Sequence, residues 1–118
     1  MLMVDGRVLR LVQRAASADV AAFLDSPTAR ELIAAGRVVS TRALEPRERA
    51  ELADDPRIGA AAAAQILEHE PVPFPSYPYE WPAEMLFEAG RLTLDLAERL
   101  VPEGLGLKDA TPYNVLFR

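Results

Sequence analysis

The strongest constraint on the fold is a run of five prolines in twelve residues, PVPFPSYPYEWP, at Pro71–Pro82. Proline fixes φ and lacks a backbone N–H donor, so this segment cannot form a helix or a central β-strand. The residues between the prolines include four aromatics, Phe74, Tyr77, Tyr79 and Trp81. We predict a rigid extended segment whose rings are buried against the residues that follow. A docking motif for a proline-recognising module is the alternative, although the segment lacks a clean PxxP repeat flanked by basic residues.

A long helix is predicted directly after the prolines, over Pro82–Val101. One apolar stripe recurs at spacings of three and four, which is typical of a helix face. Its members are Met85, Ala89, Leu92, Leu96 and Leu100. A second stripe, Phe87, Leu94 and Val101, recurs every seven residues. A helix that is apolar on two sides is expected to be largely buried, and Pro102 is expected to end it.

The first seventy residues predict short strands alternating with short helices. The expected strands are Gly6–Val12, which an Asp5-Gly6 turn opens, Arg37–Thr41 and Gln65–Glu70. The expected helices are Ala18–Leu24, Pro27–Ala35 and Arg47–Ala53. Ser17 and Ser26 are expected helix caps, and Pro27 after Ser26 strengthens that start. Gly36 is expected to end the helix in a left-handed conformation. The alanine-rich run makes a helix over residues 60–67 the alternative to the third strand.

Composition narrows the possible functions. The 118 residues are expected to form a single N-terminal domain or fragment of α+β class, with short strands and helices packed on one side. The absence of cysteine excludes disulfides and thiolate metal sites. His69 is the only histidine and is expected to be an ordinary polar residue at a strand end. The net charge of −5 provides no basic face for nucleic acid, and no membrane segment or signal peptide is expected, so the predicted location is cytoplasmic.

The C-terminal stretch GLKDATPYNVLFR contains the candidate chemistry. Asp109 and Asn114 are five positions apart, with Pro112 between them, and a short strand is expected over Val115–Phe117. This is the D-x-x-x-x-N spacing of the catalytic loop of protein kinases. In that chemistry the aspartate accepts the proton of the nucleophile and the asparagine helps to hold a metal ion. Spacing alone favours a capped turn, because Asp and Asn are common in loops.

The other parts of a kinase site are missing from the sequence. There is no G-x-G-x-x-G loop, and Lys108 is the only lysine, so no lysine lies on an early strand. A second metal-binding aspartate would lie beyond Arg118. We therefore do not expect a working phosphotransferase in these residues alone, and a kinase-like remnant that binds a magnesium nucleotide through Asp109 and Asn114 is an alternative.

Three segments together resemble a known family. They are YPYEW at Tyr77–Trp81, the leucine-rich helix Met85–Leu100, and LKDATPYN at Leu107–Asn114. Most of the chain is similar to the N-terminal region of a family of bacterial class I S-adenosylmethionine (SAM)-dependent methyltransferases. The resemblance implies an incomplete kinase-like lobe here, a methyltransferase domain downstream, and SAM as the cofactor of the full-length protein. The glycine-rich cofactor loop has no counterpart in this chain, so the methyl-transfer site cannot be assigned to its residues.

The resemblance transfers two sets of residues. The first set lies in LKDATPYN: Asp109 and Asn114 are the catalytic-loop-like pair, Asn114 is the possible metal ligand, and Lys108 and Tyr113 belong to the same motif. The second set lies in YPYEW and consists of Tyr77, Glu80 and Trp81. The leading hypothesis is the N-terminal, non-catalytic portion of a methyltransferase-like protein, whose partner is its missing downstream domain. The fragment alone is then expected to be inactive, with an unpaired edge or apolar surface at Val115–Phe117. A stand-alone interaction module using Pro71–Pro82 is the third hypothesis.

Overall fold

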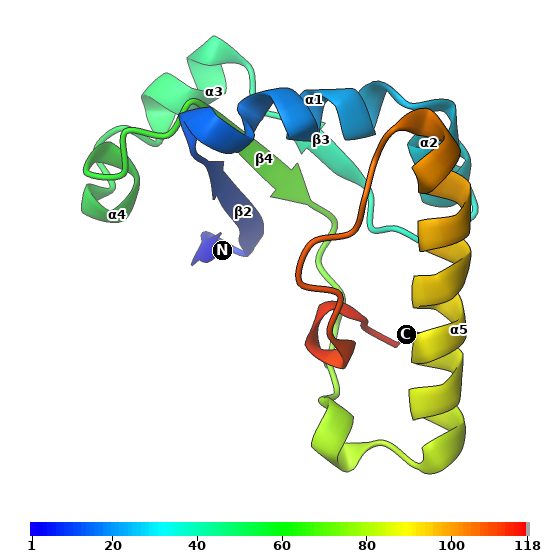
Figure 1. The fold of residues 1–118 in the computed structure, drawn as a ribbon. Coiled ribbons are helices and arrows are strands. Elements are labelled where there is room, and N and C mark those ends of the chain that lie inside the picture. The colour runs from blue at the N-terminus through cyan, green and yellow to red at the C-terminus, as the bar shows by residue number, and fades with distance from the viewer. Residues whose placement is uncertain (118) are drawn as a thin grey trace. The chain divides into compact units, whose positions relative to one another are not determined.

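A computed structural model describes residues 1–117 of the chain (Figure 1). Its contacts divide the chain into two units, Met1–Pro71 and Val72–Arg118. In chain order, with η for a 3-10 helix, the elements are β1 (Leu2–Val4), β2 (Arg7–Val12), η1 (Arg14–Ala16), α1 (Ser17–Asp25), α2 (Pro27–Ala34), β3 (Thr41–Ala43), α3 (Pro46–Glu51), α4 (Pro56–Gly59), β4 (Gln65–His69), η2 (Pro78–Glu80), α5 (Ala83–Leu100), η3 (Val101–Glu103) and η4 (Pro112–Asn114). Helices and an antiparallel sheet are both present, which confirms the α+β class. Within the described residues, no helix has the length and apolar character needed to span a membrane.

The first unit is built on a four-stranded antiparallel sheet with the strand order β1-β2-β4-β3. A two-residue turn, Asp5 and Gly6, joins β1 to β2, and both residues have positive φ, 48° and 77°. Such turns match the right-handed twist of the strands they connect, and Asp-Gly is a preferred sequence for them. The predicted turn and second strand are therefore confirmed, whereas the three-residue β1 was not predicted.

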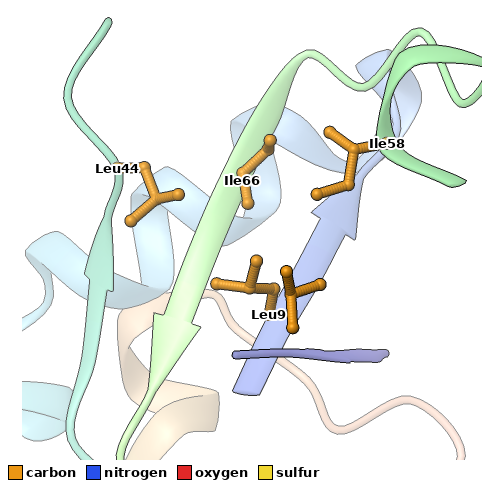
Figure 2. Close-up of a cluster of buried hydrophobic side chains, with 5 residues drawn as sticks. Leu9, Leu44, Ile58 and Ile66 are labelled. Carbon is orange, nitrogen blue, oxygen red and sulfur yellow. The ribbon is translucent and has the colours of Figure 1, made fainter. Parts of the chain in front are cut away.

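One face of the sheet carries the core of this unit. The buried cluster consists of Val4, Leu9, Leu44, Ile58 and Ile66. Figure 2 shows Leu9 on β2 and Ile66 on β4 side by side, with Ile58 of α4 beside them. Val12 and Leu67 are buried on the opposite face, because side chains alternate along a strand. Figure 2 also shows α1 behind the sheet on that opposite face, so helices lie on both faces rather than on one.

The start and end of α2 follow the sequence prediction. The Ser26 Oγ accepts a hydrogen bond from the Ala29 amide at 3.0 Å, and Gly36 has a φ of 67°. The predicted Ser17 cap is wrong, because Ala16 occupies the cap position of α1 and makes no side-chain bond. The predicted strand Arg37–Thr41 is also wrong. The amides of residues 37 and 38 still donate to the Leu32 carbonyl at the end of α2, so β3 begins only at Thr41.

The ambiguous alanine-rich segment ends in a strand. β4 covers Gln65–His69 and pairs with both β2 and β3, which confirms the strand and excludes the alternative helix over residues 60–67. The short helix expected near residues 47–53 is confirmed as α3. The single turn α4 was not predicted. Asp55 caps it by accepting from the Arg57 amide at 2.9 Å, and Ile58 reaches the core from it.

The second unit contains the long helix predicted after the prolines. Its extent is confirmed, but the expected burial of both stripes is wrong. Ala89 and Leu100 are buried, whereas Phe87 and Leu94 of the second stripe are 68% and 65% exposed. Helical periodicity reports an apolar face but not whether anything covers it. The predicted strand Val115–Phe117 is also wrong, because a 3-10 turn precedes it and it belongs to no sheet within residues 1–117.

Candidate functional site

The loop that contains Asp109 and Asn114 is a self-contained exposed turn. Asp109 has a positive φ of 54°, which lets its carbonyl accept hydrogen bonds from two later groups. The Thr111 amide donates to it at 2.8 Å, and the Asn114 side-chain amide donates to it as well. The Asn114 backbone N–H in turn donates to the Thr111 carbonyl at 3.0 Å, closing the turn η4. The structure thus brings Asp109 and Asn114 together through the backbone of Asp109.

The side chains of this loop are exposed and offer few ligands for a metal ion. Residues 108 to 114 are all exposed. Within residues 1–117, no hydrogen bond or ion pair joins Lys108 or Tyr113 to Asp109. No group of three acidic, histidine or cysteine side chains in this part of the chain is placed to hold a metal ion. Asp109 and Asn114 are both exposed, and Asp109 is the only acidic side chain in this turn.

The YPYEW motif forms a second local structure. The Glu80 carboxylate accepts a hydrogen bond from the Tyr77 amide at 2.7 Å, and so caps the 3-10 turn η2. The rings of Tyr77 and Tyr79 stack with centroids 5.8 Å apart and planes 7° apart. The Trp81 indole N–H donates to the Ser76 Oγ at 2.8 Å. Glu80 and Trp81 therefore have structural partners in this motif.

Trp81 connects the proline-rich segment to the C-terminal tail. Its ring meets that of Phe117 edge to face, with centroids 4.9 Å apart and an interplanar angle of 82°. Helix α5 also contacts the turn η4. The two signature motifs, separated by the whole of α5, are thus held within one unit. Sequence reasoning missed this role of Phe117, because an apolar residue after a polar loop carries no sign of its partner.

The expected burial of the aromatic residues is confirmed only for Trp81, which is 7% exposed. Phe74 and Tyr79 are 97% and 75% exposed, and Tyr77 is 46% exposed. Phe74 lies at a bend between two prolines, where it has a positive φ of 51°. The prediction for these three rings is wrong, because proline spacing limits the backbone but does not provide a surface to cover the rings.

The first unit carries an ion-pair network that the sequence analysis did not find. Glu68 on β4 accepts from the Arg7 guanidinium at 2.6 and 3.1 Å and also pairs with Arg42. Arg42 in turn binds Glu48 of α3 at 2.7 and 2.8 Å. Arg42 lies directly opposite Glu68 in the register between β3 and β4. The register, which the sequence does not reveal, brings these four charges together.

The network perturbs the acids in one direction. The hydrogen bond from Arg42 lowers the pKa of Glu48 to about 2, and the bond from Arg7 lowers the pKa of Glu68. The pKa values of Arg7 and Arg42 are raised by the same hydrogen bonds. Each of these four charges has a partner of opposite sign. This arrangement is typical of a structural ion-pair network that joins neighbouring strands and α3, rather than of an acid–base site.

His69 lies at the end of β4, as expected. Its Nδ1 is 2.7 Å from the Thr41 hydroxyl on the neighbouring strand β3. Burial, followed by the nearby positive charges of Arg10 and the N-terminal amine, lowers the pKa of the imidazole. A neutral ring that shares one hydrogen bond across two strands is typical of a core histidine.

The chain has an α+β fold, and the loop that contains Asp109 and Asn114 is an exposed polar turn. Over 111 residues the chain is 32% identical to the nodulation protein NoeA of Rhizobium meliloti strain 1021. The match covers 94% of this chain and 21% of that protein, so the chain spans about a fifth of the length of this curated relative. No family model matches the chain, and no solved structure matches it.

Proposed function

We propose that this chain is the N-terminal, non-catalytic region of a SAM-dependent methyltransferase-like protein. The observation that carries the proposal is the match to NoeA, which extends along nearly the whole chain but covers only about a fifth of the larger protein. The YPYEW and LKDATPYN motifs lie within one unit, joined through Trp81 and Phe117, and this supports a shared structural role.

The architecture also supports a cofactor site outside this chain. Nucleotide-containing cofactors in Rossmann-like folds bind at the carboxyl ends of parallel strands, where a glycine-rich loop leads into a helix. The sheet described here is antiparallel throughout. Two strands lead into helical segments through short connections, β2 through Gln13 and β3 through Leu44 and Glu45, and neither connection contains a glycine. The residues present therefore do not fit SAM, and no methyl-transfer step is assigned to them.

The coding sequence downstream of Arg118 provides the first test. We expect a continuing reading frame with a strand, a glycine-rich loop and a helix. Calorimetry with SAM provides the second. The 118-residue chain is expected to give no binding heat, and the same chain extended through the downstream segment is expected to bind. SAM binding by the short chain, or an extended protein that does not bind SAM, would contradict the proposal.

A kinase-like remnant that binds a magnesium nucleotide is the second candidate. It is favoured by the turn that joins Asp109 to Asn114 and leaves the Asp109 carboxylate exposed. Calorimetry with ATP and magnesium, on the wild type and on the double variant Asp109→Ala/Asn114→Ala, tests it directly. Binding that is lost in the double variant supports this candidate. Binding that survives there places the nucleotide elsewhere, and no binding by the wild type excludes the candidate.

An interaction module that uses Pro71–Pro82 is the third candidate, and the exposed rings of Phe74 and Tyr79 favour it. A labelled peptide of this segment, presented to a lysate beside a control peptide with both rings replaced by alanine, tests it. Selective capture of one protein by the wild-type peptide supports the candidate. Equal capture by both peptides would exclude it.

A further inference from the structure

Helix α5 has two apolar faces, and only one of them is buried. Phe87, Leu94 and Val101 are between 65% and 68% exposed. At 3.6 residues per turn, their stripe lies about 160° around the helix from the stripe that contains the buried Ala89 and Leu100. Solvated helix faces are normally polar. An exposed apolar stripe on an 18-residue helix indicates a surface that is covered by something else.

Small residues alternate with the large ones along this stripe. In chain order it reads Ala83, Phe87, Gly90, Leu94, Ala97 and Val101, a set that we call the α5 seam. The steps between its members are four and three in strict alternation, which is the spacing of a coiled-coil contact line. A Cβ added at Gly90 would meet nothing within 4 Å, so the surface above Gly90 is open to a side chain from outside.

The order of sizes selects one way of pairing two such helices. In an antiparallel pair with a two-fold axis through position 92, each large residue faces a small one. The layers are then Phe87 with Ala97, Leu94 with Gly90, and Val101 with Ala83, each pair joining one copy to the other. A parallel pair would instead stack large on large and small on small, giving alternately overfilled and empty layers, which close packing disfavours.

We propose that the α5 seam is an interface between two copies of this chain, which pair antiparallel about a two-fold axis that passes between the helices at the level of position 92. A two-fold interface must be complementary to itself, and the seam meets that condition in all three of its layers. A surface hollow lined by Ala83, Glu84, Phe87 and Glu88 lies at one end of the seam, at the position that faces Val101 of the second copy. The occupant that the pattern fits is therefore the same seam.

The residues beside the seam predict how strong the association is. Leu86 and Thr93 border it on one side, and Glu84, Arg91 and Glu98 border it on the other. In the antiparallel pair, Glu84 of one copy approaches Glu98 of the second, Arg91 approaches Arg91 of the second, and like charges repel. The seam consists of six residues of one helix, whereas stable dimers bury roughly 1,200–2,000 Å². We expect a weak dimer that becomes tighter when salt screens these like charges.

Sedimentation over a wide concentration range, with the full chain, tests for the dimer. The wild type is expected to shift from monomer to dimer as its concentration rises, and to do so at lower concentration in high salt. Leu94→Glu is expected to remain monomeric while its helical circular dichroism is unchanged, because residue 94 is mostly exposed. Phe74→Glu makes the same kind of change at a 97% exposed ring outside the seam and is the matched control. A wild-type chain that stays monomeric at every concentration, or a dimer that Leu94→Glu leaves intact, overturns the proposal.

A size exchange tests the pairing itself. Gly90→Leu is expected to weaken the dimer about tenfold or more, because it places leucine against Leu94 of the second copy. The double variant Gly90→Leu/Leu94→Gly restores one large and one small residue in each of the two affected layers and is expected to regain the wild-type association. A double variant that is weaker than either single variant would contradict the two-copy seam.

The direction of the helices can be read by cross-linking, since the chain has no cysteine of its own. A mixture of Ala83→Cys and Val101→Cys chains is expected to give the mixed disulfide under mild oxidation, in preference to either self-linked product. Preferential linking of Ala83→Cys chains to one another would mean a parallel pair and would overturn the antiparallel arrangement.

Discussion

Trp81 is the side chain that ties the proline-rich segment to the C-terminal tail, and its replacement by alanine is the sharpest test of that half of the chain. It is 7% exposed. An aromatic side chain buries about 200 Å², and at about 25 cal/mol per Å² this gives roughly 5 kcal/mol as an upper bound. Measured replacements of buried Trp or Phe by Ala cost about 3–5 kcal/mol. We expect Trp81→Ala to lower the free energy of unfolding by about 3–4 kcal/mol.

Urea denaturation followed by far-UV circular dichroism is the appropriate assay, because Trp81 is the only tryptophan and its variant has no indole fluorescence. Trp81→Phe keeps a ring against Phe117 but loses the N–H bond to Ser76. That hydrogen bond is worth about 1 kcal/mol, so this variant should be clearly less destabilised than Trp81→Ala.

A double-mutant cycle isolates the ring contact. Trp81→Ala, Phe117→Ala and the combined variant are compared with the wild type. Edge-to-face pairs contribute about 0.5–1.5 kcal/mol beyond their buried area. The loss of stability in the combined variant should therefore be smaller than the sum of the two single losses by that amount. Strict additivity, or a loss below about 1 kcal/mol for Trp81→Ala, would refute the view that this contact anchors the tail.

Two further predictions concern the first unit. The pKa values of Glu48 and Glu68 are depressed in the folded chain, so their contribution to stability is present above the unfolded value near 4.5 and is lost as the pH falls toward 2. The melting temperature should therefore decline below about pH 4.5, and less steeply in Glu68→Gln; an equal decline would contradict the role of the network with Arg42. Ser26→Ala removes the bond to the Ala29 amide at the start of α2 and should cost about 1 kcal/mol in urea denaturation, whereas Ser26→Asp should retain most of the stability.

Local signals predicted the elements well where one residue type determines the backbone. The Asp-Gly turn, the Ser-Pro start of α2 and the glycine at its end all appear where the sequence placed them. Each of these acts within about four residues, through a cap, a fixed φ or a freely adopted positive φ. The strand expected at Arg37–Thr41 failed because hydrogen bonds back to α2 take the amides that a strand would need.

The sequence pointed to the candidate loop but not to the hydrogen bonds that shape it. Spacing drew attention to Asp109 and Asn114, and the structure joins them through a backbone carbonyl rather than through opposed side chains. Burial was predicted for both Trp81 and Phe74, and it is found for Trp81 but not for Phe74. The Arg7–Glu68 pair spans 61 positions and could not be found by any local pattern.

The sequence by itself determined the chain's local geometry: where helices start and end, where prolines forbid regular structure, and that α5 is apolar on two faces. These properties depend on the covalent structure of each residue and on its nearest neighbours. Tertiary structure alone decided the register that brings Arg42 opposite Glu68, the contact of Trp81 with Phe117, and which face of α5 is left exposed. Such outcomes depend on contacts between residues distant in the chain, where many pairings have similar local cost and only the packed whole selects one.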